Sequence, residues 1–360
     1  MTNCPAGREW WQEEIKLDYR RSTLHLLAIT TVALSAPVPH LPDMTETCSP
    51  RSPRRSGVAL ALQGGSAHGA FTWGVLDRLL EDGITVGAVC GVSSGAILGT
   101  LLVQGLVRGG NAGARQEMRQ LWRLVAQAHN LSPLQTSPLD RWLFGWDLSN
   151  SLIWCGWEMA MRLFSPAQLN PFGHNPLRPL LTGLLEPALL THPAAPCLTV
   201  ACTDVETGEA ALFHNDTIGV EVLVASACLP FVFPAVRIGD RAYWDGGYAG
   251  NPPLGPLLTP VLPNELVLIR AQPARRPGVP ATPIEITNRL NEIACHNVLS
   301  AELAALPAGV RLTVYDADAA LLDLPISSKF NGEAEFLSEL FEAGRAAVPT
   351  RSGGLAAAAD

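Results

Sequence analysis

The sequence predicts an α/β fold in which helices cover both faces of a mostly parallel sheet. The first observation is the apolar run VALALQ at 58–63, which stops at Gly64-Gly65 as a buried parallel strand ending in a tight turn would. The second is a helical pattern behind that turn, followed by the strand-like TVGAVCGV and a second helical segment, SSGAILGTLLVQGL. Strand–helix–strand–helix at this spacing implies parallel pairing through right-handed crossovers.

The remaining elements continue this alternation with one interruption. In the first helix Phe71 and Val75 have helical spacing, and Gly83 closes the helix. A more polar helix is expected over 114–128, and the segment 131–175 then departs from the pattern with Pro- and Trp-rich sequence. Strands are expected at CLTVACTDV, its hairpin partner AALFHN, RAYWD, LVLIRA and RLTVYDA, and helices near 217–228, 284–305 and 333–347.

Length and composition describe a globular chain. Of 360 residues, 48% are hydrophobic and 16% are charged, which is too apolar for general disorder. The formal charge of −8 argues against a nucleic-acid partner, because phosphate binding needs a concentrated basic surface. We assign 57–349 to the folded domain, 1–56 to an N-terminal extension that is disordered or precedes the true start, and 350–360 to a flexible tail.

Cysteine usage and the N-terminal sequence bear on the compartment. None of the eight cysteines forms a C-x-x-C pair, and several lie in apolar runs, where a reduced thiol behaves as a small hydrophobe. The run LHLLAITTVALSA at 24–36 resembles a signal-peptide core, but it is too short to span a bilayer as a helix and acidic residues precede it. We expect a cytoplasmic protein, with peripheral membrane contact left open and secretion less favoured.

The strongest local signal is a G-x-S-x-G motif, GVSSG at 91–95, between an expected strand and an expected helix. Gly91 and Gly95 permit the sharp turn that lifts the Ser93 hydroxyl above the sheet edge at a helix N-terminus. The pattern alone is weak, and the strand–turn–helix context makes it informative. Ser93 is therefore the predicted nucleophile, and a plain glycine turn is the alternative.

A second glycine-rich turn, GGSAHG at 64–69, opens the first helix. Backbone N–H groups at such a turn can stabilise the oxyanion that acyl transfer generates. A dinucleotide loop is disfavoured because Ser66 stands at the middle glycine of G-x-G-x-x-G, and the next strand ends at a serine instead of an acid. A phosphate loop would need G-K-[ST], which is missing here. An oxyanion hole is the favoured interpretation.

A third signal, Asp245-Gly246-Gly247, follows the expected strand RAYW. An acid at the carboxyl end of a strand, followed by glycines, lies where α/β sheets place their sites. By itself the tripeptide is equally typical of a surface turn. Its weight comes from its combination with the other two motifs.

Taken in order, LQGGSAHGAF, GVSSG and WDGG resemble the patatin-like phospholipase family, and the likeness extends over roughly 57–349. The resemblance implies a three-layer fold and cleavage of lipid carboxylic esters of the phospholipid or lysophospholipid class. It implies a dyad without histidine, in which Ser93 attacks the acyl carbonyl, Asp245 takes its proton, and water releases the acyl-enzyme. No cofactor or metal is expected, since no carboxylate cluster has calcium-loop spacing.

The resemblance also assigns the oxyanion hole to the N–H groups of Gly64, Gly65 and Ser66. The sequence departs from the family pattern G-G-G-x-R/K-G twice, with Ser66 at the third glycine and His68 at the basic position. Neither change removes a backbone N–H. If position 66 requires a positive φ, however, a serine there costs on the order of 1 kcal/mol or more.

Two other functions fit parts of the sequence. The order Ser93, Asp245, His296 is also that of an α/β-hydrolase triad, although that fold has several strands before its elbow and only two precede Ser93 here. His296 also falls within a helical pattern, where a histidine without a catalytic role is the simpler interpretation. The second alternative is a lipid-binding or regulatory protein that keeps the fold and has lost turnover through Ser66.

The segment 131–175, expected to be a helical cap, contains four tryptophans: Trp142, Trp146, Trp154 and Trp157. Tryptophan favours membrane interfaces, so this cap could contact lipid. Alternatively, the rings fill the core of the cap itself. We favour the second interpretation because Asp140, Asp147 and Glu158 interrupt any face suited to anionic lipid. Neither the exact lipid substrate nor the oligomeric state is predicted.

Overall fold

The computed structural model describes residues 57–349, except 137, 150 and 260–262. The predictions for 1–56, with their signal-like run, and for 350–360 lie outside the described residues. None of the helices within the described ranges is long and apolar enough to cross a membrane.

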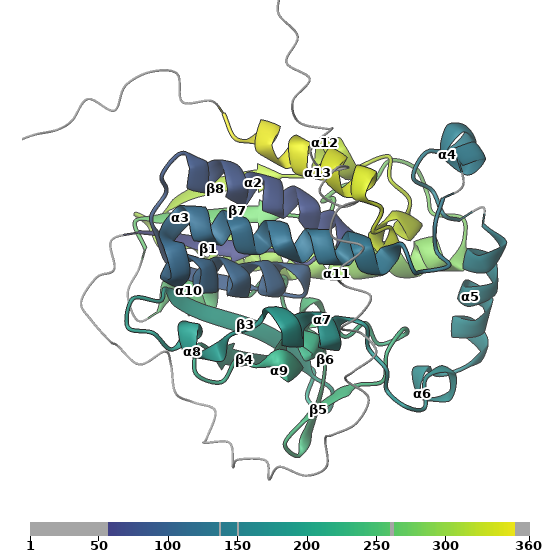
Figure 1. The fold of residues 1–360 in the computed structure, drawn as a ribbon, viewed down its shortest axis with the longest axis horizontal. Coiled ribbons are helices and arrows are strands. Elements are labelled where there is room, and N and C mark those ends of the chain that lie inside the picture. Colours follow the sequence, from purple (N-terminus) through teal and green to yellow (C-terminus); the bar gives the residue numbers. More distant parts are fainter. Residues whose placement is uncertain (1–56, 137, 150, 260–262, 350–360) are drawn as a thin grey trace, which may run out of the picture. The chain divides into compact units, whose positions relative to one another are not determined.

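An eight-stranded sheet forms the centre of the domain, in the order β5-β6-β3-β2-β1-β7-β8 with β4 also paired to β3 (Figure 1). The run from β3 to β8 is parallel, while β4, β5 and β6 pair antiparallel with their neighbours. The predicted mostly parallel α/β fold is confirmed. The strands are β1 Val58–Leu62, β2 Val86–Gly91, β3 Cys197–Asp204, β4 Ala210–His214, β5 Val236–Ile238, β6 Arg241–Asp245, β7 Glu265–Arg270 and β8 Arg311–Asp316.

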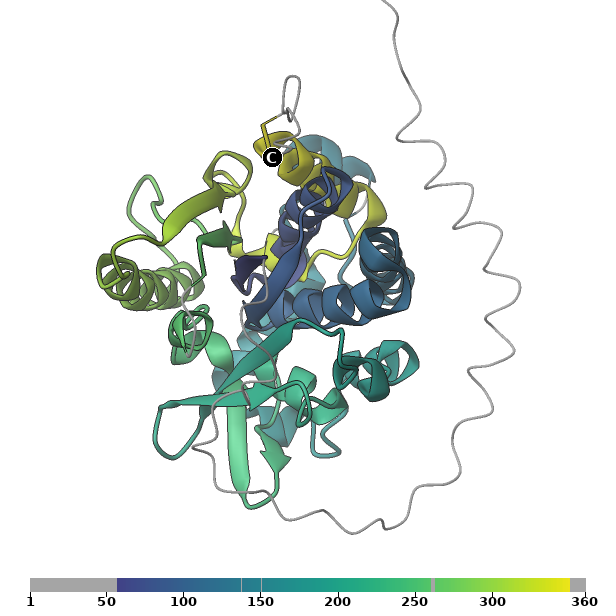
Figure 2. The same ribbon diagram turned by 90° about the vertical axis from the view of Figure 1, so that its left-hand side faces the viewer.

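Helices cover both faces of the sheet (Figure 2). On one face lie α2 (Gly69–Glu81), α3 (Ser94–His129) and α13 (Ala334–Ala347), and α2 packs closely against both of the others. On the other lie α10 (Gly255–Leu258) and α11 (Pro283–Ala304), whose leucines share a buried cluster with β1, β2 and β7. Each face buries one set of strand side chains, which explains why the central strands are apolar almost throughout.

The polar helix expected over 114–128 is not a separate element. It is the second half of α3, which continues from Ser94 to His129 with non-helical backbone only at Gly109 and Gly110. Gly110 has a φ of 60°, a conformation that glycine adopts without steric penalty. The two expected helices are therefore joined by a kink instead of a loop.

Strands β2 and β6 lie end to end along the same edge of β3. β2 pairs with the first half of β3 and β6 with its last residues, while β4 overlaps both stretches and so must occupy the opposite edge. The register sets Gly91 opposite Val200 and Asp245 opposite Cys202, only two residues further along β3. The carboxyl ends of β2 and β6 therefore meet, although the two strands run in opposite directions.

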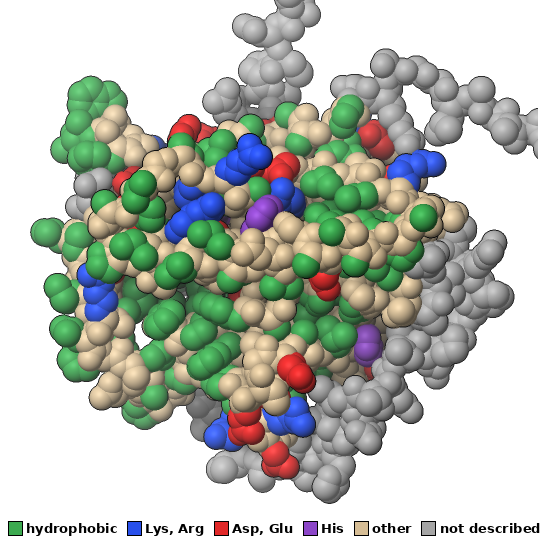
Figure 3. Space-filling model, turned by 180° about the vertical axis from the view of Figure 1, so that it is seen from behind, with side chains coloured by type: hydrophobic (Ala, Val, Ile, Leu, Met, Phe, Trp, Pro, Cys, Tyr) green, Lys and Arg blue, Asp and Glu red, His purple; other side chains and the backbone are tan. Residues whose placement is uncertain are grey.

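The cap consists of α4 (Pro138–Phe144), α5 (Leu152–Leu163) and α6 (Pro166–Leu169). Trp154 and Trp157 pack edge-on against each other and both contact Phe330, and Trp146 packs against α13. Trp142, in contrast, is 80% exposed. Trp154 is buried, whereas Trp146 and Trp157 are half-buried and pack on Phe336 and Phe330 outside the cap. The expectation that the tryptophans fill the core of the cap itself is wrong for Trp142. Seen from behind, hydrophobic side chains crowd the surface on this side of the domain, around a hollow (Figure 3).

The other helical elements are short. They are α7 Leu177–Leu184, α8 Pro187–Leu190, α9 Val220–Ser226, α12 Asp318–Leu321 and the 3₁₀ turns η1 Ser66–His68, η2 Gly246–Tyr248 and η3 Ile326–Phe330. Of these, η1, η2, η3 and α9 surround the ends of β1, β2 and β6. They supply side chains around the site described next.

Candidate active site

Ser93 lies in the turn between β2 and α3, where its backbone has a φ of 55° and a ψ of −125°. A non-glycine residue in such a conformation carries strain on the order of 1–3 kcal/mol. A Cβ at Gly91 would lie 2.5 Å from the carbonyl oxygen of Gly95, and one at Gly95 would overlap the carbonyl of Leu62. Both glycines of the motif are thus sterically required, and they let the turn lie against β1 and α3.

Ser226, at the end of α9, holds this turn in place. Its hydroxyl accepts a hydrogen bond from the Ser93 N–H (2.9 Å) and donates one to the Ala201 carbonyl in β3 (2.8 Å). Ser226 is fully buried, so an unpaired N–H or hydroxyl at this point would cost free energy. The bond ties the strained residue to the centre of the sheet.

Asp245 is held by three hydrogen bonds at the end of β6. Its N–H donates to the Cys228 carbonyl (2.8 Å), and its carbonyl accepts from the Thr203 hydroxyl (2.8 Å). One carboxylate oxygen accepts from the Gly247 N–H (2.8 Å). A side chain at Gly246 would overlap the backbone of β3, so the D-G-G turn is tightly constrained at its first glycine.

The electrostatic environment suits Asp245 as a proton acceptor. Burial raises the pKa of Asp245 to about 6, against the opposing effects of the Gly247 N–H, the Ser93 hydroxyl and the positive charge of Lys329. Lys329, from η3, is itself largely buried and donates to the Asn288 side-chain oxygen (2.8 Å). Burial also lowers the pKa of Lys329. At neutral pH, Asp245 is therefore mostly a carboxylate next to the serine hydroxyl.

The glycine-rich turn lies against Ser93 from the side of β1. A Cβ at Gly64 would lie 2.8 Å from the Ser93 Cβ, and one at Gly65 would lie 2.7 Å from the Ala271 carbonyl oxygen. The side-chain oxygen of Gln63 accepts hydrogen bonds from the Ala271 N–H and the next residue's N–H, both at 2.9 Å. Only glycine permits this close approach, and the glutamine joins the turn to the end of β7.

Two of the three N–H groups expected to form the oxyanion hole already have partners. The Gly64 N–H donates to the Asn251 side-chain oxygen (2.7 Å), and the Gly65 N–H donates to the Ser94 hydroxyl (3.0 Å). No acceptor within the described residues receives the Ser66 N–H. Ser66 has a φ of 54°, so the conformation that would strain a serine at this position is the one observed.

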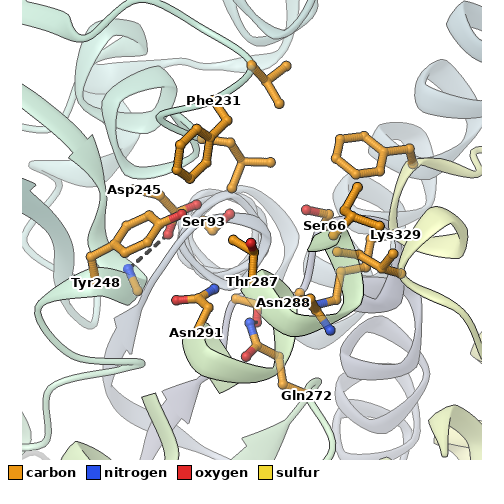
Figure 4. A pocket seen from close by; sticks show the side chains of 18 of the residues that line it. Ser66, Ser93, Phe231, Asp245, Tyr248, Gln272, Thr287, Asn288, Asn291 and Lys329 are labelled. Carbon is orange, nitrogen blue, oxygen red and sulfur yellow. Dashed lines mark hydrogen bonds between the residues drawn. The ribbon is translucent and has the colours of Figure 1, made fainter. Parts of the chain in front are cut away.

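A cavity of about 430 Å³ opens beside Ser93 and Asp245. Figure 4 shows Asp245 next to Ser93, with Phe231 above them and Ser66 and Lys329 across the cavity. The apolar part of the lining comes from several elements and includes Met161, Leu229, Phe231, Ile284 and Phe330. The polar part of the lining includes Ser93, Asp245 and Asn291, and an apolar wall with a small number of polar groups is typical of ligand sites.

Among the described residues, histidine does not contribute to this cavity. His296 contacts the Ser300 hydroxyl one turn further along α11 (3.3 Å), and no histidine of the described part of the chain is among the lining residues. Over the same ranges, no group of three or more His, Cys, Asp and Glu side chains is arranged to hold a metal ion. Of the carboxylates that line the cavity, Asp245 is the candidate base for Ser93, because it interacts with the Ser93 hydroxyl.

Three of these residues were not singled out from the sequence: Ser226, Asn251 and Lys329. Ser226 occurs within the ASACLPFVFPAV stretch and Asn251 six residues after Asp245, so their positions near motifs are a weak signal. Lys329 has no such sequence signal, because it lies more than 80 residues beyond the last motif and is brought to the cavity by the tertiary structure.

The chain was compared with family models, with curated sequences and with solved structures. The model of the family described as patatin-like phospholipase matches residues 60–258. No curated protein sequence matches the chain significantly. Of solved structures, VipD from Legionella pneumophila is similar at 15% identity and a TM-score of 0.38, with 81% of this chain and 66% of that one covered.

A second similar structure is the heterodimeric ExoU–SpcU complex from the type III secretion system of Pseudomonas aeruginosa. Its identity is 20%, its TM-score is 0.29, and the match covers 89% of this chain and 68% of that one. Neither structural likeness bears on activity. The family model, however, covers more than half of the sequence and includes all three motifs. The chain belongs to the patatin-like phospholipase family.

Proposed function

We propose that this protein is a serine acyl hydrolase that cleaves carboxylic esters of phospholipids or lysophospholipids through a dyad of Ser93 and Asp245. The observation that carries the proposal is the contact between two side chains. The hydroxyl of Ser93, whose backbone is strained, contacts the buried Asp245 carboxylate, whose pKa is raised to about 6. The mostly apolar cavity beside this pair supports an acyl chain as the bound group. Family membership supports lipid ester hydrolysis in general.

In the proposed reaction, the Ser93 oxygen attacks the ester carbonyl carbon while Asp245 accepts the hydroxyl proton. The tetrahedral intermediate collapses, the C–O bond to the alcohol breaks, and Asp245 gives its proton to the departing oxygen. Water then attacks the acyl-enzyme, losing a proton to Asp245, and that proton returns to Ser93 as the fatty acid leaves. A base with a pKa just below neutral pH can perform both transfers.

The proposed oxyanion hole is centred on the Ser66 N–H. Ser66 lines the cavity and its N–H has no protein acceptor within the described residues, whereas the N–H groups of Gly64 and Gly65 are occupied. The Gly65 N–H is bonded to the Ser94 hydroxyl, which can rotate away when an oxyanion forms, so it is the second donor we propose. The Gly64 bond to Asn251 then acts to position the turn.

We also propose that the protein is cytoplasmic. The six cysteines in the described ranges are free thiols, which is the state that a reducing compartment maintains.

The test is turnover of a water-soluble short-chain nitrophenyl ester, compared between the native protein and Ser93→Ala. We expect loss of hydrolysis with an unchanged fold, and labelling of Ser93 by a fluorophosphonate probe in the native protein. Retention of a tenth of the activity, or labelling of another serine, would show that the nucleophile is different. A panel of phospholipids, lysophospholipids and neutral glycerides then identifies the substrate class.

The alternative of a lipid-binding protein without turnover draws on one observation, which is that two of the three expected oxyanion donors are engaged. The same assay separates the two functions. A pure binding protein gives no hydrolysis above the Ser93→Ala control while still binding lipid.

A further inference from the structure

Helix α5 is apolar on both of its sides. Its inner side packs Trp154 and Trp157 into the domain. Its outer side carries Leu152, Met159 and Leu163, which lie seven and four residues apart and so share one face, and all three are exposed. Leu152 is 89% exposed. A helix that is apolar on two opposite sides normally has both of them covered, and the outer side of α5 is not covered by any described part of the chain.

The exposed apolar surface continues onto the neighbouring segments. Trp142 on α4 and Phe172 after α6 are 80% and 95% exposed, and Phe231 is 60% exposed. We call the set formed by Trp142, Leu152, Met159, Leu163, Phe172 and Phe231 the cap face. Soluble proteins rarely expose apolar groups in such a concentration unless the surface binds a partner or a membrane. Figure 3 shows such side chains gathered around the hollow on this side.

Part of the cap face borders the cavity. Phe231 lines the cavity and is also exposed, while Met161 of α5 forms part of the wall. An occupant that covers Phe231 and the adjoining cap would therefore lie beside the route to Ser93. A second protein copy or another protein in that position would block the route, whereas a lipid surface would deliver substrate into it.

Two of the acidic residues that argued against a lipid-facing cap, Glu158 and Asp147, have partners within the protein. Glu158 pairs with Arg162 one turn along α5, and the Asp147 carboxylate accepts a hydrogen bond from a serine hydroxyl (2.8 Å). The side chain of Asp140 lies outside the described residues. Arg141 is paired with two glutamates. Because Glu158, Arg162 and Arg141 are paired within the protein while Asp147 keeps a negative charge, the cap face offers no cationic attraction and would bind lipid through its apolar side chains.

We propose that the cap face docks the enzyme onto a zwitterionic lipid surface, with Trp142, Leu152 and Phe172 inserted among the acyl chains and the cavity opening toward the lipid. The proposal rests on the proposed function, since only a lipid substrate makes this occupant preferable to a protein. The formal charge of −8 agrees with a neutral lipid surface and not with an anionic one.

The test uses vesicles of pure phosphatidylcholine and protein carrying Ser93→Ala, so that binding is measured without hydrolysis. We expect Trp142→Glu, Leu152→Glu and Phe172→Glu together to lower vesicle partitioning at least tenfold, with partitioning of the parent unchanged between 0.1 and 1 M NaCl. The matched control is Leu312→Glu, an exposed leucine near the amino end of β8, away from the site, which should leave partitioning unchanged.

Two further measurements keep folding defects apart from docking. With Ser93 intact, the triple variant should hydrolyse the water-soluble ester at the native rate and lose activity on vesicle lipid. In the parent, brominated phosphatidylcholine should quench tryptophan emission, and the mild Trp142→Phe change should remove much of that quenching. Unchanged partitioning of the triple variant, salt-sensitive binding, equal loss in Leu312→Glu, or a shift from dimer to monomer without an effect on vesicles would each overturn the proposal. Absence of hydrolysis alone would refute only the proposed function.

Discussion

The carboxyl edge of the sheet buries a charged group, whereas the cap beside it exposes apolar side chains. At the sheet edge, Ser66 and Ser93 hold strained backbones and Asp245 holds a buried carboxylate, each fixed by neighbouring groups. In the described part of the cap, the unusual feature is apolar surface left in water, as at Leu152 and Phe172. Among the described residues, a positive φ at a non-glycine residue thus occurs only at the proposed site, and apolar exposure is marked where the proposed lipid would arrive. Each region can be tested by changes that leave the other intact.

The largest expected effect concerns the sheet edge. Asp245→Asn should lower kcat/KM for the soluble ester by a factor of about 10³ or more, because the general base is lost while the shape is kept. His296→Ala should cost little, since His296 contacts Ser300 and does not line the cavity. Paired steady-state kinetics of the two variants provide the measurement. If a single histidine change silences the enzyme as fully as Asp245→Asn, a Ser–Asp–His triad replaces the dyad.

Asp245→Asn should also make the folded protein more stable. The folded-state pKa of Asp245 is raised to about 6 from 3.8, so the group favours folding below pH 3.8 and opposes it increasingly as the pH rises through 6. At pH 8 the cost approaches about 3 kcal/mol from a shift of roughly two units, and the amide removes it. Urea unfolding at pH 8 should show the gain, and a loss of stability would mean that the carboxylate is stabilised by partners in the native state.

In the cap, two tryptophans differ in burial, so their replacement should have different effects on the unfolding free energy. Trp154→Ala should cost about 3–5 kcal/mol of unfolding free energy, because the ring is buried against Trp157 and Phe330. Trp142→Ala should change stability by less than about 0.5 kcal/mol, since its ring is exposed. Denaturant unfolding of both variants checks this. Similar losses would indicate that Trp142 has packing partners in solution.

A smaller effect is expected on the pH dependence of turnover. The acidic limb of kcat/KM should have its midpoint near pH 6, because activity needs the Asp245 carboxylate and its pKa is about 6. The charge of Lys329 holds that pKa down, so Lys329→Met should move the limb to higher pH. Lys329→Arg keeps the charge and serves as the control. A limb that stays in place in Lys329→Met would show that another group governs it.

The sequence predicts the local structure around each motif well, because each motif lies within a few consecutive residues. A strand, a glycine-shaped turn and a helix lie within a few residues of Ser93, and short-range sterics determine all three. Asp245 was expected at a sheet edge on the assumption of parallel strands. It reaches Ser93 because antiparallel β6 continues the edge of β3 where β2 ends. That arrangement depends on long-range pairing, which no local pattern encodes.

The same limit applies to the groups around the dyad. Lys329 and Ser226 act at the site through distant segments, and a single lysine or serine carries no signal of its own. The engagement of the Gly64 N–H by Asn251 could not be read from the sequence either, because it depends on a contact across 187 positions. For the cap, composition indicated many tryptophans, but only packing shows that Trp142 faces outward while Trp154 is buried.

The smallest expected effect, at Ser66, tests whether strain at the sheet edge is real. Ser66 has a φ of 54°, where a side chain costs on the order of 1–2 kcal/mol and glycine costs none. Glycine also raises the conformational entropy of the unfolded chain, which reduces this gain in stability by about 0.4–1 kcal/mol. Ser66→Gly should therefore raise the unfolding free energy by up to about 1 kcal/mol while turnover stays within a few-fold, because the N–H remains. Ser66→Ala is the matched control, since it removes the hydroxyl and keeps the strain, so it should bring no gain. If alanine stabilised the protein as much as glycine, the benefit would come from losing the hydroxyl. If glycine destabilised it, the serine side chain would have to make a contact that outweighs its backbone strain.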